Sequence, residues 1–377
     1  MDELDYSCFM IDSGSGQWKA GFAGEEKPRT SVPAAAGTPK HQLIQPSMMY
    51  FSELRYIGEE ALERRGLLDL EHPVQRGVVT NWDDIQKLVG HIFYSWHRSY
   101  PEEHCTLFTE PPFNPKSHRE KMTEVMIEKL YMPGIFFANA AVLASQRDSL
   151  VLDIGEGVCQ VVPIRDGEAI VHAVQRMDLA GIDLTKYLQN LLNKKGLSFV
   201  TSAEHDIVRE IKEKVSYVAL DFDREMKVAA SAPESVNISY ELPDGHNITV
   251  GSERFRAAEA LFQPKLIESD HPGIHELVYS SIMTCDADVR PLLFGNVTLA
   301  GGSTMIRGFP ERLKKELSAL APPGIKVNVI APPKREQSAW VGGSKLACSI
   351  PFQDNWILRQ EYLEHGASLV HKKCQLF

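Results

Sequence analysis

The sequence predicts an α/β protein that folds as two lobes, and three observations support this prediction. Apolar residues recur at helical spacing in several segments, for example at positions 122, 125, 126 and 130. Short β-branched runs such as residues 325–330 alternate with these segments, as strands alternate with helices in α/β proteins. With 377 residues, 43% of them hydrophobic, the chain can bury a large core and divide into two lobes.

The individual elements follow from the same patterns. We predict helices over residues 122–130 and 207–218, a helix after Gly308, and a strand over residues 325–330. The segment from Tyr240 to Val250 predicts a hairpin, because Asp244-Gly245 between two strand-like runs suits a turn that needs a positive φ. Proline pairs mark loops, and no low-complexity linker separates the lobes, so we expect crossover connections rather than a tether.

Composition argues against several classes of protein. Fifty acidic and 40 basic residues give a net charge of −10, and no basic run stands out, so we expect no direct contact with nucleic acid. Three of the first five residues are acidic and the apolar run after them is short, so we expect no signal peptide and no membrane insertion. The six cysteines are scattered, as in a reducing compartment, and the histidines form no zinc-binding pattern.

A weak internal duplication is the most informative feature. Residues 9–19 and 150–161 each contain an apolar strand that ends in Asp-x-Gly-x-Gly and continues into another strand-like run. The aspartates are Asp12 and Asp153. Either segment alone is more simply read as an ordinary glycine-rich turn. Because both lie directly behind a buried type of strand, their repetition favours a shared function.

The two hairpins suit phosphate and a divalent cation. A turn with two glycines can direct backbone N–H groups into a nest that binds phosphate without a basic patch. The carboxylates of Asp12 and Asp153 suit Mg²⁺, which is usually held through few carboxylates together with waters and phosphates. Lys19 can place a charge on a phosphate, although a strand lysine is often only a solvated edge. A third segment, a strand followed by Gly301-Gly302, is typical of backbone that approaches a nucleotide.

These three segments, in this order, resemble the actin family, within the superfamily that also contains sugar kinases and heat-shock chaperone ATPases. The resemblance runs from end to end of the chain. Further segments similar to actin at matching positions include Lys19–Gly24, Val79–Asp84, Asp178–Gly181, Glu259–Pro264, Trp340–Ser344 and Val370–Cys374.

The resemblance implies an actin-like ATPase fold. Two lobes, each with a five-stranded mixed sheet flanked by helices, would enclose a nucleotide cleft. The outer, small lobe would comprise residues 1–141 and 338–377, with residues 35–70 as its filament-contact extension, and the inner, large lobe residues 142–337. The cleft would hold ATP or ADP with Mg²⁺ or Ca²⁺.

The resemblance also implies roles for particular residues. Asp12 and Asp153 would hold the cation through water. The nucleotide-binding residues would be Ser15, Gly16, Lys19, Gly155, Glu156, Gly157, Lys212, Glu213, Gly301, Gly302 and Met305.

Departures from the actin pattern concentrate where hydrolysis would occur. Ala140 stands where actins carry a glutamine, and Gln160 where they carry a histidine, so we assign no catalytic residue. Asn139, one residue earlier, is an alternative to the glutamine that is missing at position 140. Glu156 stands in place of an aspartate, and its longer side chain would crowd the cation. Around the base, Ile306, Glu336 and Gln337 also differ, so we expect weaker adenine binding and hydrolysis that is weakened or lost.

The leading functional hypothesis is an actin-like cytoskeletal protein that binds ATP and assembles into, or caps, filaments. Its partners would be itself, actin, or both, together with actin-binding proteins, in the cytoplasm or the nucleus. The stretch 39–52, longer and more apolar than its actin counterpart, would be a partner contact. An alternative is a non-polymerising actin-related subunit of a larger complex, such as dynactin or a chromatin remodeller, although this chain lacks the long insertions common there. A sugar kinase is a third possibility, which the actin-like segments disfavour.

Overall fold

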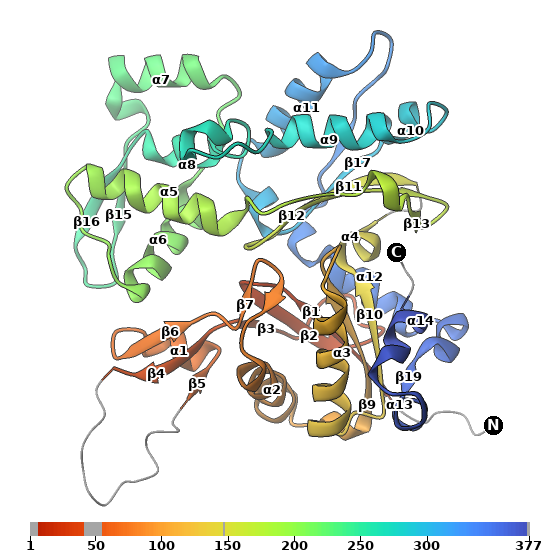
Figure 1. Cartoon of the computed structure of the whole chain (residues 1–377). Coiled ribbons are helices and arrows are strands. Elements are labelled where there is room, and N and C mark those ends of the chain that lie inside the picture. Colours follow the sequence, from red (N-terminus) through yellow and green to blue (C-terminus); the bar gives the residue numbers. More distant parts are fainter. Residues whose placement is uncertain (1–6, 41–54, 146–147, 375–377) are drawn as a thin grey trace, which may run out of the picture. The chain divides into compact units, whose positions relative to one another are not determined.

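The computed structural model describes residues 7–40, 55–145 and 148–374. The chain divides into two compact units, shown in Figure 1. Unit 1 comprises Met1–Gln146, Gly167–Ala169 and Gln337–Phe377, and unit 2 comprises Arg147–Asp166 and Ile170–Glu336. The acidic first residues and residues 41–54, which contain most of the expected partner contact, lie outside the described part of the chain.

Unit 1 is built on a sheet with the strand order β19-β10-β9-β1-β2-β3. Its elements are β1 (Ser7–Ser13), β2 (Gln17–Phe22), β3 (Thr30–Pro33), β4 (Ala36–Pro39), β5 (Tyr56–Ile57), α1 (Glu59–Glu63), β6 (Leu68–Glu71), β7 (Val74–Gln75), β8 (Val78–Val79), α2 (Trp82–His91), β9 (His104–Glu110), α3 (Lys116–Glu124), β10 (Gly134–Asn139), α4 (Ala140–Ala144), β13 (Glu168–Ala169), α12 (Ser338–Ala347), β19 (Ile357–Leu358), α13 (Arg359–His365) and α14 (Val370–Lys373). Five strands were predicted for this sheet and six are present, because the two-residue edge strand β19 pairs with β10. Within residues 35–70, the described part forms a small sheet of the order β5-β4-β6.

Unit 2 is built on strands in the order β12-β11-β17-β18, with β14 also pairing with β12. Its elements are β11 (Ser149–Ile154), β12 (Cys159–Arg165), β14 (Gln175–Met177), α5 (Gly181–Lys194), α6 (Ser202–Val215), α7 (Phe222–Ser231), β15 (Ile238–Glu241), β16 (Asn247–Val250), α8 (Glu253–Glu259), α9 (Ile274–Thr284), α10 (Arg290–Gly295), β17 (Val297–Ala300), α11 (Phe309–Leu320) and β18 (Val329–Ile330). The hairpin expected between Tyr240 and Val250 is confirmed as β15 and β16, with Gly245 at φ 84°.

The other element predictions hold with local changes. The helix expected after Gly308 is confirmed as α11. The helix expected over 207–218 is present as α6, but it begins earlier, at Ser202, and ends earlier, at Val215. The helix expected over 122–130 begins earlier, at Lys116, and its last part, Val125–Lys129, is a π-helical turn. The strand expected over 325–330 was too long, because only Val329–Ile330 pair with β17.

Alternation along β1 places helices on both faces of the unit 1 sheet. Phe9 packs on Phe93, which follows α2, with ring centroids 4.5 Å apart. Met10 points to the other face, where α12 lies: Gly343 comes so close that a Cβ there would lie 2.4 Å from the Met10 side chain. The Trp340 indole N–H also donates to the Met10 carbonyl, at 3.0 Å. Successive residues of a strand face opposite sides, so β1 is buried from both.

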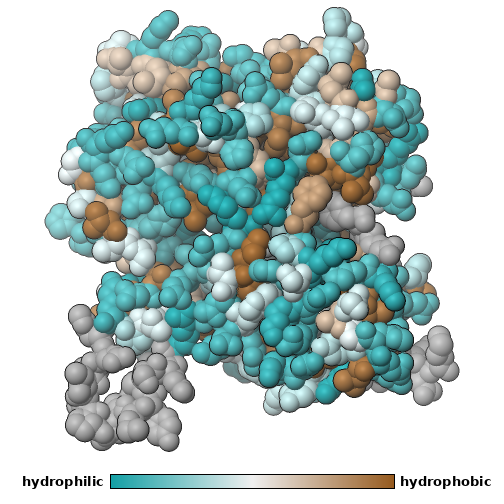
Figure 2. All heavy atoms as spheres, in the orientation of Figure 1, coloured by the Kyte–Doolittle hydropathy of each residue, from teal (hydrophilic) through white to brown (hydrophobic). Residues whose placement is uncertain are grey.

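Side chains on the surface are mostly polar. On the face that Figure 2 shows, hydrophilic residues predominate and hydrophobic ones are scattered between them. Within the described residues, no helix combines the length and the apolar character that crossing a bilayer requires.

His97 occupies an unusual position in the unit 1 core, and we expect it to make the unit sensitive to acid. Both of its ring nitrogens are buried without a hydrogen-bond partner, and its ring packs edge-on against Phe9 at 4.9 Å. Burial lowers the pKa of His97 to about 4; the Arg29 charge and His104 act in the same direction, and Glu25 opposes them. Between about pH 6.5 and 4 the unfolded chain therefore binds a proton that the folded chain does not, and stability falls as the pH falls.

We expect the substitution His97→Phe to raise stability at pH 5 by roughly 1 kcal/mol and to flatten its pH dependence, because it removes two unsatisfied buried nitrogens. Urea denaturation at pH 7 and pH 5 measures both effects. The control is His246→Gln, because the imidazole of His246 is 82% exposed. A pH dependence that is unchanged by His97→Phe would contradict the assignment. His104, whose pKa is also lowered by burial, accounts for a residual slope.

Candidate functional site in two hairpins

The first hairpin joins β1 and β2 and places a carboxylate opposite an ammonium group. Asp12 and Lys19 are directly paired across the two antiparallel strands. The Lys19 Nζ lies 3.0 Å from Asp12 Oδ2, and both side chains are mostly buried. The Thr109 hydroxyl donates to the other carboxylate oxygen, Oδ1, at 2.9 Å. Asp12 is thus oriented through both of its oxygens.

Thr109 was not among the residues predicted from the sequence, and it comes from the neighbouring parallel strand. β1 and β9 pair in parallel with Ile11 opposite Phe108, so the residues that follow, Asp12 and Thr109, meet at the carboxyl ends of both strands. The Ser13 backbone N–H donates to the Thr109 hydroxyl at 2.8 Å. Carboxyl ends of parallel strands are where α/β sheets usually hold their ligands.

Gly14, in the first turn, allows close packing rather than a left-handed backbone. A Cβ on Gly14 would lie 2.7 Å from the Gln17 carbonyl oxygen. The described residues with a positive φ include none of the four hairpin glycines, Gly14, Gly16, Gly155 and Gly157. The Ser15 hydroxyl accepts a hydrogen bond from the Gly77 backbone N–H at 2.9 Å, which ties the turn to the segment after β7.

The second hairpin repeats this arrangement in unit 2, with an amide in place of the ammonium group. Asp153 and Gln160 are paired across β11 and β12, and Gln160 Nε2 donates to Asp153 Oδ2 at 2.6 Å. The turn is closed by a hydrogen bond of 2.9 Å from the Gly155 N–H to the Val158 carbonyl. Both hairpins therefore carry a strand-end carboxylate held by the facing residue of the second strand.

Gly301 lies directly against the second carboxylate. It has φ 83°, a conformation that favours glycine, and a Cβ there would lie 2.3 Å from Asp153 Oδ1. β11 and β17 are parallel, with Asp153 opposite Ala300, so the Gly301-Gly302 turn begins at the carboxyl end next to Asp153. The structure thus brings the second and third sequence segments together.

Lys212 and Glu156 form an ion pair beside this turn. The Lys212 Nζ lies 3.3 Å from Glu156 Oε2 and donates to the Gly181 carbonyl at 2.8 Å. Lys212 is 3% exposed. Glu156 therefore has a cationic partner inside unit 2, and Lys212 is held at the hairpin.

Gly181 and Ser303 complete the network and were both missed in the sequence. The Gly155 carbonyl accepts from the Ser303 hydroxyl at 2.7 Å and from the Gly181 N–H at 3.1 Å. A Cβ on Gly181 would lie 2.5 Å from Glu156 Oε2. The absence of a side chain at Gly181 leaves room for the Glu156 carboxylate and the Ser303 hydroxyl at the start of α5. A lone glycine gives no such signal in a sequence.

The residues predicted to line the nucleoside belong to two segments that lie together. Tyr217, just after α6, bridges to Arg307, and the Val218 N–H donates to the Arg307 carbonyl at 2.8 Å. Glu213 is exposed on α6, and Met305 is 39% exposed in the short helical turn Gly302–Met305. The buried Arg335 stabilises that turn by donating a hydrogen bond to the Thr304 carbonyl at 2.6 Å.

Ala140 and Asn139 stand at the start of α4. The Asn139 side-chain oxygen caps this helix, accepting from the N–H groups of Ala141 at 2.9 Å and Val142 at 3.2 Å. Asn139 is 1% exposed, so its amide is committed to the cap, which disfavours it as a replacement for a water-orienting glutamine. Ala140 is the first residue of the helix and carries no polar group.

The donor chemistry of both hairpins fits a hard cation with phosphates. Each supplies one carboxylate, and Lys19 adds a cation. Within the described residues, no group of three or more histidine, cysteine, aspartate or glutamate side chains converges on a single point. Mg²⁺ does not need such a group, because it keeps several waters and commonly uses one or two carboxylates with the substrate's phosphates.

Two α/β units on mixed sheets, each with a strand-end aspartate in a glycine-containing hairpin, define a class of two-lobed α/β proteins. A family model described as actin matches residues 3–375. The chain belongs to the actin family. The predicted family and the predicted actin-like fold class are confirmed.

Proposed function

We propose that this actin-family protein binds ATP or ADP together with Mg²⁺ or Ca²⁺, and that each unit contributes one hairpin. Units 1 and 2 would be the outer and inner lobes of the family. The observation that carries the proposal is the repeated pairing of a strand-end carboxylate with a hydrogen-bonding side chain, Asp12 with Lys19 and Asp153 with Gln160. One such turn is common, but the same arrangement twice in one chain is not expected from turn chemistry alone.

The residues of each hairpin suit separate tasks. Asp12 and Asp153 would hold the cation through its water ligands, and the bound cation would neutralise charge on the phosphates. The phosphates would be bound by Ser15, Gly16, Lys19, Gly155, Glu156 and Gly157. The nucleoside would be lined by Lys212, Glu213, Gly301, Gly302 and Met305.

We propose that hydrolysis is weak or absent. Ala140 and Gln160 carry no group that accepts a proton, and Asn139 is used as a helix cap. The Glu156 carboxylate is paired with Lys212. Losing a positioned proton-transfer group commonly costs about 10²–10⁴ in rate.

The cellular role that we propose is cytoskeletal, in the cytoplasm, with assembly into filaments or capping of filaments of actin. Membership of the actin family supports it. The alternative is a non-polymerising subunit of a larger complex that uses nucleotide structurally. Sedimentation and electron microscopy with ATP, Mg²⁺ and physiological salt distinguish the two: filaments support the first, and nucleotide binding without filaments, alone or with actin, supports the second.

Thermal stability with and without nucleotide tests the binding site. A ligand present at a hundredfold excess over its dissociation constant stabilises the folded state by about 2.7 kcal/mol. We expect ATP with Mg²⁺ to raise the melting temperature of the wild type, and Asp12→Asn or Asp153→Asn to reduce this rise. Titration with Mg²⁺ at a constant ATP concentration measures the loss of cation binding separately from the loss of ATP binding.

Matched controls are Asp354→Asn in unit 1 and Asp223→Asn in unit 2, since both carboxylates are exposed. Each removes one charge from the same unit and leaves the hairpin unchanged. Loss of the ATP effect in a control as well, or a full ATP effect in both hairpin variants, would argue against the proposed site.

A further inference from the structure

The two hairpins differ in the charge of the side chain that faces the carboxylate. In the first, the Lys19 ammonium group lies 3.0 Å from Asp12 Oδ2. In the second, the neutral Gln160 amide donates to Asp153 Oδ2 at 2.6 Å. Both facing residues have the same place in the strand register, directly across from the aspartate. An ammonium group neutralises a carboxylate, whereas an amide only forms a hydrogen bond with it.

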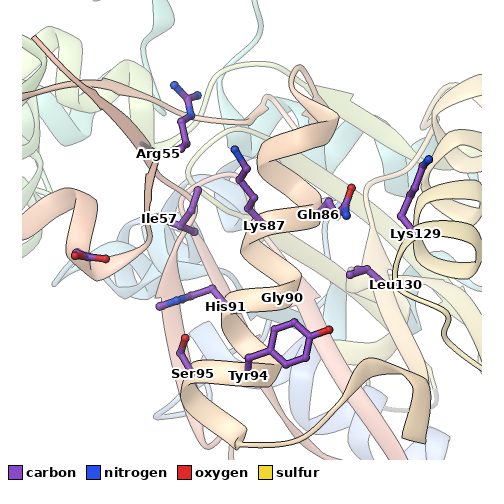
Figure 3. Close-up of a pocket in the computed structure, with 11 residues that line it drawn as sticks. Arg55, Ile57, Gln86, Lys87, Gly90, His91, Tyr94, Ser95, Lys129 and Leu130 are labelled. Atoms are coloured by element: carbon purple, nitrogen blue, oxygen red, sulfur yellow. The ribbon is translucent and has the colours of Figure 1, made fainter. Parts of the chain in front are cut away.

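The ion pair of the first hairpin joins two strands that are already joined. β1 and β2 are paired through their backbones along this hairpin. Arg55, just before β5, is different, because it contacts Asp84 of α2 and Glu71 of β6. Figure 3 shows Arg55 among the side chains that line a pocket next to α2. Arg55 thus links separate elements, whereas Lys19 adds no connection that the backbone lacks, so its partner can change without breaking the sheet.

Burial makes the two charges of this pair depend on each other. The side chains of Lys19 and Asp12 are 16% and 12% exposed. Removing one partner of a buried ion pair leaves an uncompensated charge, which is strongly unfavourable. If Asp12 bound a divalent cation alone, the Lys19 ammonium would remain beside a second positive charge. If Lys19 bound a phosphate alone, the Asp12 carboxylate would remain beside a second negative charge.

We propose that the ion pair of Lys19 and Asp12 makes the nucleotide and the cation bind together at the first hairpin. Without ligand, the Lys19 ammonium neutralises Asp12 in place of the cation. On binding, Lys19 moves to the phosphates and Asp12 accepts from the water ligands of the cation, so both charges exchange partners at once. Each ligand therefore raises the affinity of the chain for the other. This inference rests on the proposed nucleotide site and adds how its two ligands are coupled.

Binding of each ligand alone tests the proposal on the full-length chain, after EDTA has removed metal and nucleotide and dialysis has removed the EDTA. Isothermal titration calorimetry measures the affinity for Ca²⁺ without nucleotide and, with EDTA added again, for metal-free ATP. We expect Lys19→Gln to bind Ca²⁺ at least about fivefold more tightly than the wild type, because the competing ammonium group is gone. We expect Asp12→Asn to bind metal-free ATP at least about fivefold more tightly, because it releases Lys19 and removes a negative charge.

The matched controls are Lys27→Gln and Asp354→Asn, which make the same changes in net charge at exposed positions of unit 1. Each should alter these affinities less than about twofold, because salt screens an exposed charge outside the hairpin. The amide introduced by Lys19→Gln copies the arrangement of Gln160 in the second hairpin. Circular dichroism confirms that each variant is folded.

The proposal would be overturned if Lys19→Gln bound Ca²⁺, or Asp12→Asn bound metal-free ATP, no more tightly than its control, and undetectable binding counts as this result. A purely structural ion pair would lower the stability of both variants without strengthening the binding of either ligand. The rise in melting temperature with ATP and Mg²⁺ distinguishes the two proposals. If the wild type shows this rise and the variants behave like their controls, only the coupling fails; without the rise, the nucleotide site itself fails.

Discussion

Replacing Arg312 with leucine is expected to destabilise unit 2 by about 3–5 kcal/mol, the largest stability effect that we anticipate for a single substitution outside the hairpins. Arg312, on α11, forms a two-pronged ion pair with Glu259 of α8, with both N–O distances at 2.9 Å. Glu259 has no exposed surface and Arg312 is 6% exposed. The substitution would leave a carboxylate buried without a cation.

The cause of this loss is the uncompensated charge rather than the absence of the pair itself. Burial raises the pKa of the Glu259 carboxyl, and the hydrogen bonds from Arg312 oppose that shift. Arg312 also donates to the Ala219 carbonyl at 2.7 Å, so its removal frees a second buried acceptor. Replacing both partners by leucine should therefore cost less than Arg312→Leu alone.

Hydrogen exchange of the α8 and α11 amides, together with urea denaturation, measures the effect in unit 2. The control is Lys314→Leu, an exposed cation on the same helix, which should change stability by no more than about 0.5 kcal/mol. If Arg312→Leu behaved like this control, the ion pair would have no part in holding α8 to α11.

Restoring the two missing side chains is expected to raise ATP hydrolysis by at least about a hundredfold. The variant is Ala140→Gln with Gln160→His, which returns the pattern of the actin family at both positions. A histidine at position 160 can still donate to Asp153, as Gln160 does at 2.6 Å, and it can also accept a proton. This prediction depends on the proposed nucleotide binding.

Phosphate release in single-turnover experiments, with ATP binding checked by thermal stabilisation, measures the gain. Ala144→Gln is the matched control, because it adds the same side chain to the other end of α4. A rate in the wild type that already equals the rate of the double variant would contradict our proposal that these positions limit hydrolysis. An increase in the control would show that the gain has another origin.

The elements that were predicted from the sequence follow from local patterns. The apolar face of α11 and the Asp244-Gly245 turn depend on residues close together in the chain. The errors concern strands whose length or existence depends on pairing with a segment far away in the chain. The strand expected over 325–330 is shortened to the two residues that meet β17, and β19 exists only because it meets β10.

The residues of the candidate site also fall into two groups, those that the sequence predicted and those that only the structure revealed. The aspartate at the end of each hairpin strand is visible in the sequence, since strand and turn are contiguous. Thr109, Gly181 and Ser303 are not visible, because they reach the hairpins from strands and helices far away in the chain. The close packing of Gly14 against the Gln17 carbonyl is likewise not visible in the sequence, and phosphate binding by the two turns stays a prediction.

The sequence by itself determined the family, the α/β elements and the two aspartates, all of which depend on order and spacing along the chain. Only the tertiary structure decided which group each charged side chain contacts. Lys212 faces Glu156, Arg312 faces Glu259, and Lys87 faces no partner among the described residues. The reason is physical: the energy of a charged group depends on its neighbours and its burial, and these are set by packing between segments that are distant in the chain.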